Sequence, residues 1–196
     1  MVIMRIVVVG AAGTLGSALA GLLKTEGHEI AGVSRSSEPP VDLSRPESLE
    51  DALRALAPFD GLVCLGPGTP LRPLAELTPA QLETDFAGKL FGQIEVLRVA
   101  ATLMTNGVVV LTGGASPELE GGSGGTAVNA ALAAFITAAR RELPEHIRAH
   151  VVSPGWVTES IPPDWDIPDS TPAAVVAAAY LHTLTAPDTP AVITVP

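Results

Sequence analysis

Apolar runs alternate with amphipathic stretches along this chain, and the alternation predicts strands separated by helices. The run 3–9 is continuous and rich in β-branched residues, which is typical of a central parallel strand covered on both faces. Runs of the same kind predict further strands at 29–33, 61–65, 108–111, 147–152 and 191–195, with a very short one at 41–42.

Helical patterns fill the segments between these strands. The expected helices are 13–26, 46–56, 78–104, 126–143 and 172–184, the third being either one long helix or a pair. Ser44 and Thr78 are the expected N-caps of the second and third, each followed closely by a proline. Such βαβ units build a doubly wound sheet through right-handed crossovers. We therefore expect a single α/β Rossmann domain, residues 1–196, with a parallel sheet of about seven strands and helices on both faces.

The composition is typical of a folded domain. Hydrophobic residues make up 47% of the 196 residues and charged residues only 16%. A disordered chain has low hydrophobicity and high net charge. This length suits one domain that buries a good core.

The net charge of the chain limits the kinds of partner that it can bind. Acidic residues outnumber basic ones by 21 to 11, a formal net charge of −10, which opposes binding to nucleic acid or to anionic membranes. The longest apolar runs fall well short of the ~20 residues that span a bilayer. A signal peptide is the competing interpretation of the first run, but its basic start and cleavage pattern are missing. Cys64 has no second cysteine to pair with, so we expect a small buried side chain in a cytoplasmic protein.

A glycine-rich loop follows the first strand and opens the first helix. Gly10 allows the tight turn, Gly13 lets a diphosphate approach the backbone, and Gly16 lets helix and sheet pack closely. The helix N-terminus adds free N–H groups and partial positive charge. The pattern predicts a dinucleotide site; a purely structural turn is the alternative.

The end of the second strand favours one coenzyme. An NAD site usually has an acidic residue here for the ribose hydroxyls, but this chain has Ser34, Arg35 and Ser36. A guanidinium can bind a 2′-phosphate while the hydroxyls donate to it. We therefore expect NADP(H) in preference to NAD(H), with a solvated surface arginine as the alternative.

These features, together with Asp42-Leu43 and the segment 154–158 (Pro-Gly-Trp-Val-Thr), resemble the short-chain dehydrogenase/reductase family over nearly the whole chain. The resemblance implies that Asp42 contacts the adenine, although an ordinary turn residue is the alternative. It also implies that Pro154 and Gly155 frame the nicotinamide, and that Val157 contacts it through its backbone N–H.

The resemblance completes the expected coenzyme site. The family's asparagine-rich motif appears here as 64–68 (Cys-Leu-Gly-Pro-Gly), which keeps the backbone contacts but not the asparagine side chains. The full set of expected coenzyme-binding residues is Gly10, Gly13, Thr14, Leu15, Gly16, Ser34, Arg35, Ser36, Asp42, Leu43, Leu65, Gly66, Lys89, Pro154, Gly155 and Val157.

The chain differs from the family at the catalytic positions. The family's catalytic set is Asn, Ser, Tyr and Lys, with Tyr and Lys one helical turn apart. Here Gly125 stands at the Tyr position, Asn129 at the Lys position and Gly113 at the Ser position, with Thr112 beside it. Lys89 stands at the Asn position. The only tyrosine, Tyr180, lies in the last helix and cannot take over.

We interpret this pattern as an exchange of Lys and Asn. Lys89 would supply the ammonium from the opposite wall, while Asn129 would bond the nicotinamide ribose or Lys89 itself. Burial would lower the pKa of Lys89 and phosphate would raise it, so Lys89 is a general acid if burial dominates. Anchoring of coenzyme or structure, without proton transfer, is the alternative. Thr112 is a further catalytic candidate.

Other polar residues carry weaker signals. No histidine stands at ligand spacing from Cys, Asp or Glu, so no metal is expected. Asp164, Asp166 and Asp169 read as solvated turn residues, or alternatively as a cap over the pocket. Trp156 and Trp165 could line an apolar substrate pocket.

The helix 126–143 is apolar on almost every face, which indicates burial on more than one side. The sheet covers one side only. We therefore expect a homodimer or homotetramer built through helices 78–104 and 126–143, the arrangement that the resemblance also implies.

Three functions fit the sequence. The first is an NADP(H)-dependent oxidoreductase that acts on a small carbonyl or alcohol substrate with a rearranged proton relay. The second is an NADP-binding sensor or regulator without catalysis, favoured by the missing tyrosine. The third is a dimeric scaffold without coenzyme, which the retained Pro-Gly segment argues against.

Overall fold

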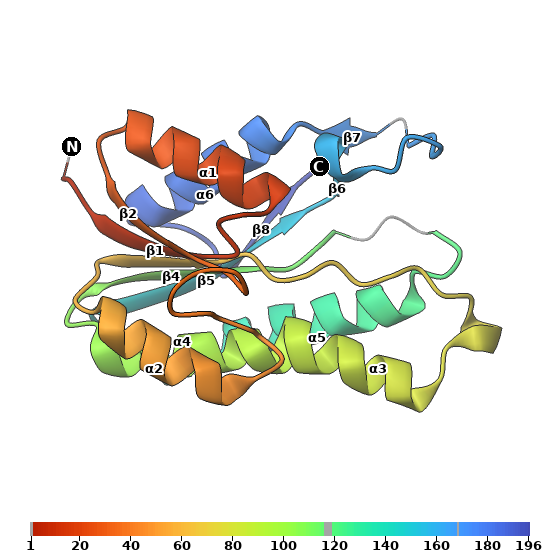
Figure 1. The fold of residues 1–196 in the computed structure, drawn as a ribbon, viewed down its shortest axis with the longest axis horizontal. Helices are drawn as coiled ribbons and strands as arrows, with labels where there is room; N and C mark the ends of the chain where they lie inside the picture. The colour runs from red at the N-terminus through yellow and green to blue at the C-terminus, as the bar shows by residue number, and fades with distance from the viewer. Residues whose placement is uncertain (1, 116–118, 168) are drawn as a thin grey trace.

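A computed structural model describes residues 2–115, 119–167 and 169–196. Six parallel strands form one sheet in the order β2-β1-β3-β4-β5-β8 (Figure 1). Their bounds are β1 Arg5–Val9, β2 Glu29–Val33, β3 Gly61–Cys64, β4 Gly107–Thr112, β5 Ile147–Pro154 and β8 Val192–Val195. Strand order reverses between β1 and β3, which places the topological switch point beside the glycine loop.

Helices cover both faces of the sheet (Figure 1). One layer contains α1 (Thr14–Thr25) and α6 (Ala173–Thr185), which pack against each other. The other layer contains α2 (Pro46–Leu56), α3 (Pro79–Phe86), α4 (Gly92–Leu103) and α5 (Ser123–Ala139). Each layer has its own apolar core, and the buried side chains of strands β1, β3 and β4 contribute to both. The expected doubly wound Rossmann architecture is confirmed.

The main sheet has six strands rather than seven, because the expected strand at 41–42 does not form. The Val41 side chain is buried in the core, which explains its apolar signal, but its N–H donates to the carbonyl of Ser34 within a loop. A separate two-stranded ladder joins β6 (Trp156–Val157) to β7 (Ser170–Thr171).

The segment 78–104 is a single helical run with a π-helical turn, η2 (Ala87–Phe91), between α3 and α4. Thr78 caps it as expected, in a reciprocal capping box with Gln81. The expectation for Ser44 is wrong: Arg45 is the N-cap of α2, and the Ser44 hydroxyl donates instead to Asp42 at 2.7 Å.

Two buried polar side chains tie the end of β4 to its neighbours. The Gln93 amide is fully buried; it donates to the carbonyls of Lys89 (2.7 Å) and Thr112 (2.9 Å) and accepts from the Thr112 N–H (2.8 Å). The Thr112 hydroxyl donates to the Cys64 carbonyl and lies 2.7 Å from the Tyr180 hydroxyl of α6. These bonds fix the carboxyl end of β4 from both helical layers.

Among the described helices, none combines the length and the apolar character that a bilayer crossing needs.

Candidate functional site

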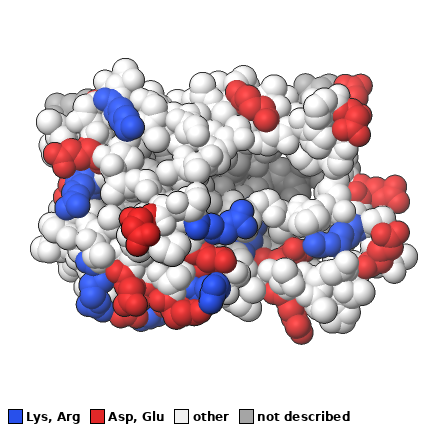
Figure 2. All heavy atoms as spheres, in the orientation of Figure 1, with Lys and Arg blue, Asp and Glu red and all other residues white. Residues whose placement is uncertain are grey.

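A cleft of about 1030 Å³ opens at the carboxyl ends of the strands. Figure 2 shows the molecule hollowed between its two helical layers, with Lys and Arg side chains along one rim. Most of the expected coenzyme-binding residues line this cleft: Gly10, Gly13, Thr14, Leu15, Gly16, Ser34, Arg35, Ser36, Asp42, Leu43, Leu65, Gly66, Lys89, Pro154 and Gly155. The fold thus brings together segments that lie up to about 145 residues apart in the sequence.

The glycine loop has the shape of a diphosphate cradle. Gly10 has a φ of +87°, and its N–H donates to the Val33 carbonyl at 2.8 Å. A Cβ at Gly16 would overlap the Gly10 carbonyl oxygen, so the first turn of α1 sits directly on the loop. A Cβ at Gly13 would meet only the Gly10 oxygen, at 3.5 Å, which leaves that position open toward the cleft. Gly13 is the N-cap of α1 and has no side chain. The first N–H groups of the helix are therefore accessible to an anionic group bound in the cleft.

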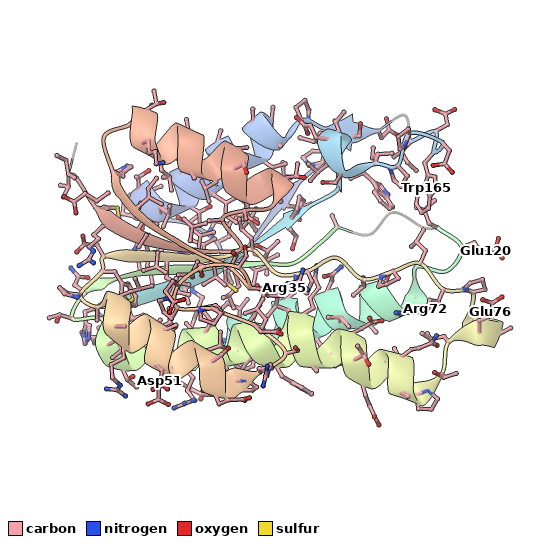
Figure 3. All side chains as sticks on the ribbon, viewed as in Figure 1. Arg35, Asp51, Arg72, Glu76, Glu120 and Trp165 are labelled. Atoms are coloured by element: carbon pink, nitrogen blue, oxygen red, sulfur yellow. The ribbon has the colours of Figure 1, made fainter. Side chains whose placement is uncertain are left out.

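The far end of the cleft has the expected basic and hydroxyl groups. Arg35 is exposed and lies at the cleft in Figure 3, while the Ser34 and Ser36 hydroxyls are 3.1 Å apart. Asp42 accepts bonds from the N–H and hydroxyl of Ser44, at 3.0 and 2.7 Å, and these bonds hold the pKa of Asp42 below its usual value. The positive charge of Arg35 lowers that pKa further.

Lys89 lies on the inner wall of the cleft, in the π-helical turn. Only 6% of the residue is exposed, and its Nζ donates to the Gly113 carbonyl at 3.1 Å. Burial lowers the pKa of the ammonium to about 8. Lys89 is therefore a cleft-facing group able to exchange a proton near neutral pH, as the desolvation argument anticipates.

Asn129 approaches the same loop from α5. It is half-buried, and a Cβ added at Gly114 would lie 2.7 Å from its Nδ2 atom. Lys89 and Asn129 thus contact consecutive residues of the segment that follows β4. Asn129 is not among the described residues that line the cleft, so Lys89 alone of the exchanged pair faces the open space.

Two of the expected site residues have other contacts. Thr112 lines the cleft, but its hydroxyl donates to the Cys64 carbonyl and is buried against Tyr180, so we assign its side chain to the packing of the sheet rather than to catalysis. Val157 is buried in β6, which pairs with β7, and it is not among the described residues that line the cleft. Its predicted N–H contact with nicotinamide therefore has no support from the shape of the cleft.

The sequence analysis did not predict an ion pair between Arg72 and Asp85, which lies near Lys89. Arg72 Nη1 lies 2.5 Å from Asp85 Oδ2, and only 6% of the Asp85 side chain is exposed. Asp85 lines the cleft one helical turn before Lys89, and that spacing on one helix is the signal that could have found it. Arg72 could not be found in this way, because only the tertiary structure brings its loop to α3.

A smaller pocket of about 140 Å³ adjoins the cleft and shares Gly114, Pro154 and Gly155 with it. Thr69, Leu71, Leu119 and Trp156 form much of its remaining wall. Gly125, which the resemblance places at the family's tyrosine position, also lines it, and a Cβ there would overlap the Thr69 hydroxyl. The Thr69 side chain thus occupies the space beside the backbone of residue 125.

The other candidates have structural roles. Cys64 is fully buried, as expected, and burial raises the pKa of its thiol. Asp164, Asp166 and Asp169 are exposed. Trp165 packs edge-on against Trp156, with ring centroids 5.7 Å apart. In the described ranges, no three His, Cys, Asp or Glu side chains are grouped to hold a metal ion.

The chain is similar to known proteins in sequence and in structure. The model of the NAD dependent epimerase/dehydratase family matches residues 6–90. No curated protein matches the chain. Among solved structures, protein lin1944 from Listeria innocua is 30% identical, with 98% of this chain and 100% of that chain covered and a TM-score of 0.90.

Two further solved structures show the same fold at lower identity. A small-chain dehydrogenase in complex with NADPH is 22% identical over 99% of this chain and 97% of that chain, with a TM-score of 0.86. A short-chain dehydrogenase/reductase from Vibrio parahaemolyticus is 23% identical over 97% and 98% of the two chains, with a TM-score of 0.80. Together with the glycine cradle and the sheet order described above, these comparisons show that the chain shares the fold of known short-chain dehydrogenases and that residues 6–90 match the NAD dependent epimerase/dehydratase family.

Proposed function

We propose that this protein is an NADP(H)-dependent oxidoreductase that interconverts a small carbonyl compound and its alcohol, with Lys89 in place of the family's tyrosine as the proton donor. The observation that carries the proposal is a buried ammonium on the wall of a glycine-lined cleft. A solved structure of similar fold is described as a complex with NADPH, which supports the choice of coenzyme.

The residues of the cleft fit a dinucleotide phosphate. The open position at Gly13 and the N-terminus of α1 suit the diphosphate, while Arg35 with Ser34 and Ser36 suits a 2′-phosphate. Pro154 and Gly155 border the opposite end, beside the smaller pocket. Bound NADPH would supply the hydride that reduces the carbonyl carbon, leaving NADP⁺.

Lys89 would complete the reduction by giving a proton from Nζ to the carbonyl oxygen, which becomes the alcohol hydroxyl. Solvent would then reprotonate the amine. A pKa of about 8 supports this role, because the group is mostly charged at pH 7 yet releases its proton readily. The bond from Nζ to the Gly113 carbonyl uses one of three donors and orients the ammonium without exhausting it.

A coenzyme-binding sensor without catalysis is the second candidate. The observation that favours it is that glycine stands at 113 and 125, where the resemblance implies the catalytic serine and tyrosine. This candidate shares the coenzyme site with the first and differs only in turnover.

We also propose that the protein is a homodimer or homotetramer built through α4 and α5. Val128, Leu132 and Ile136 of α5 are buried against the sheet, but its opposite face exposes Ala127, Ala130 and Ala134. Small apolar side chains on a helix allow close approach of a second copy, which supports isologous packing of this face.

Coenzyme binding is tested by Gly13→Asp, which places a carboxylate in the open cradle. We expect the affinity for both NADP(H) and NAD(H) to fall on the order of a hundredfold, because like charges would meet at the helix N-terminus. Gly21→Asp is the matched control, since Gly21 is exposed on the same helix with nothing near its Cβ position. Calorimetric titration measures the affinities. If the wild-type chain binds neither coenzyme, both the enzyme proposal and the sensor proposal are refuted.

Coenzyme preference is tested by Arg35→Ala. Loss of the guanidinium is expected to weaken NADPH about tenfold or more and to leave NADH almost unchanged. Arg45→Ala, which removes an exposed arginine that is not among the described cleft-lining residues, should change neither affinity. Equal losses for the two coenzymes in Arg35→Ala would refute the 2′-phosphate assignment.

The proton donor is tested by pH and by Lys89→Met. The reduction rate should be level below pH 8 and fall about tenfold per pH unit above it, because only the ammonium donates. The variant should bind NADPH and lose turnover, whereas Lys24→Met, which changes the only other lysine, should keep it.

A second measurement on Lys89→Met does not depend on activity. Between pH 8 and 10.5 the folded protein binds fewer protons at Lys89 than the unfolded chain does, so this group makes the free energy of unfolding rise with pH in that window. The rise should be smaller in Lys89→Met than in the wild type and in Lys24→Met. Identical pH profiles would show that Lys89 titrates normally.

The oligomeric face is tested by sedimentation. The wild type should sediment at a multiple of its 20.0 kDa chain mass, and Ala130→Arg should sediment as a monomer because a charge would be buried in the seam. Ser17→Arg, on the exposed side of α1, should leave the mass unchanged. A monomeric wild type would refute this interface.

A further inference from the structure

The smaller pocket beside the cleft has a consistent chemistry. Its described lining is Thr69, Pro70, Leu71, Gly114, Ala115, Leu119, Gly122, Gly125, Pro154, Gly155 and Trp156. No Lys, Arg, Asp or Glu is among these residues, and the Thr69 hydroxyl and the Trp156 indole N–H are their only polar side-chain groups. Such a wall favours an uncharged, mainly apolar occupant.

The size of the pocket indicates the size of the group that it can hold. Its volume of about 140 Å³ is close to that of an engineered apolar cavity of ~150 Å³ that holds benzene. A group of about six carbon atoms therefore fits within it.

Apolar side chains continue outward from the pocket. Leu71 and Leu119 of its wall are each 36% exposed, and Trp165, stacked edge-on against Trp156, is 40% exposed. Figure 3 shows Trp165 at the same end of the molecule as Arg72, the neighbour of Leu71. Large exposed apolar side chains that gather at one opening mark a site for an apolar ligand.

The cation nearest in sequence to this wall is already neutralised. Arg72 follows Leu71, but its guanidinium is paired with the buried Asp85 carboxylate at 2.5 Å. A carboxylate substrate would have to break that pair, and the net charge of −10 would oppose its approach. Both effects favour a neutral substrate.

Thr69 carries the only side-chain hydroxyl among the described wall residues, and the glycine at 125 leaves room for it. Any larger side chain at 125 would overlap the Thr69 Oγ1 atom. The hydroxyl thus stands between the apolar wall and the residue at which the family's tyrosine is missing, where it can bond the oxygen of a bound carbonyl compound or alcohol.

We propose that this pocket is the substrate subsite, that it takes a neutral carbonyl compound or alcohol with one apolar group of about six carbons, and that Thr69 is a positioning residue that bonds the substrate oxygen. The proposal rests on the proposed function, in which Lys89 rather than Thr69 supplies the proton.

Binding can be measured without turnover, because Trp156 and Trp165 are the only tryptophans in the chain. Their two indole N–H resonances are assigned with Trp165→Phe and followed during titration of the NADP⁺-saturated protein. Cyclohexanol should shift the Trp156 signal saturably, and cyclohexanecarboxylate should not. Equal or tighter binding of the carboxylate, or no Trp156 shift with cyclohexanol, would overturn the assignment of substrate class.

Gly125→Ala tests the location. Its added methyl would overlap the Thr69 hydroxyl, so cyclohexanol should bind on the order of tenfold more weakly. Gly124→Ala is the matched control, since its Cβ would meet only ordinary contacts at 3.6 Å with Leu77 and Leu82. Adding Thr69→Ala to Gly125→Ala removes the overlap and should restore part of the affinity. NADP⁺ should bind all these variants as it binds the wild type.

Thr69→Val tests the hydroxyl. It keeps the branched shape and should weaken cyclohexanol about tenfold, whereas Thr69→Ser should retain most of the affinity. Equal affinity of all three proteins would remove Thr69 from the proposal. If NADP⁺ binds and cyclohexanol does not, the subsite alone fails; if neither NADP⁺ nor NADPH binds, the proposed function fails, and the substrate assignment falls with it.

Discussion

The close contact between the first turn of α1 and the glycine loop is the constraint on which the site depends. The Gly16 backbone lies where a Cβ would overlap the Gly10 carbonyl, and Gly10 has a positive φ that turns the chain out of β1. This contact places the N-terminus of α1 at the carboxyl edge of the sheet. The free N–H groups of the helix therefore face the cleft, and room for an anionic group is left beside them because two backbones meet without side chains between them.

A second set of buried contacts holds the chemical end of the cleft. Gln93 bonds both the N–H and the carbonyl of Thr112, and Lys89 donates to the carbonyl of the next residue, Gly113. The π-helical turn that carries Lys89 is thereby fixed against β4. Burial lowers the pKa of Lys89, and the bond to the Gly113 carbonyl orients its ammonium on the wall of the cleft.

The glycine at 125 contributes to the shape of the smaller pocket. Because residue 125 has no side chain, the loop after β3 can approach α5 so closely that a Cβ at this position would overlap the Thr69 hydroxyl. The same loop carries Arg72 to Asp85, so that one ion pair stabilises the segment that walls the smaller pocket. The small residue on α5 and the loop after β3 together form much of the wall of the smaller pocket.

The order of strands and helices along the chain, the glycine loop and most of the residues that line the cleft could be predicted from the sequence, because they follow from apolar periodicity and from turn chemistry that are local in the chain. It misplaced a strand at 41–42 and the cap at Ser44, because Val41 is apolar for core packing rather than for pairing, and the Ser44 hydroxyl found a nearer acceptor in Asp42. Three contacts are visible only in the folded protein: Lys89 is buried against Gly113, the Thr112 hydroxyl bonds Cys64 and Tyr180, and Thr69 lies against Gly125. These contacts join residues far apart in the sequence, and no periodicity records them, because they depend on how the helical layers and loops pack across the sheet.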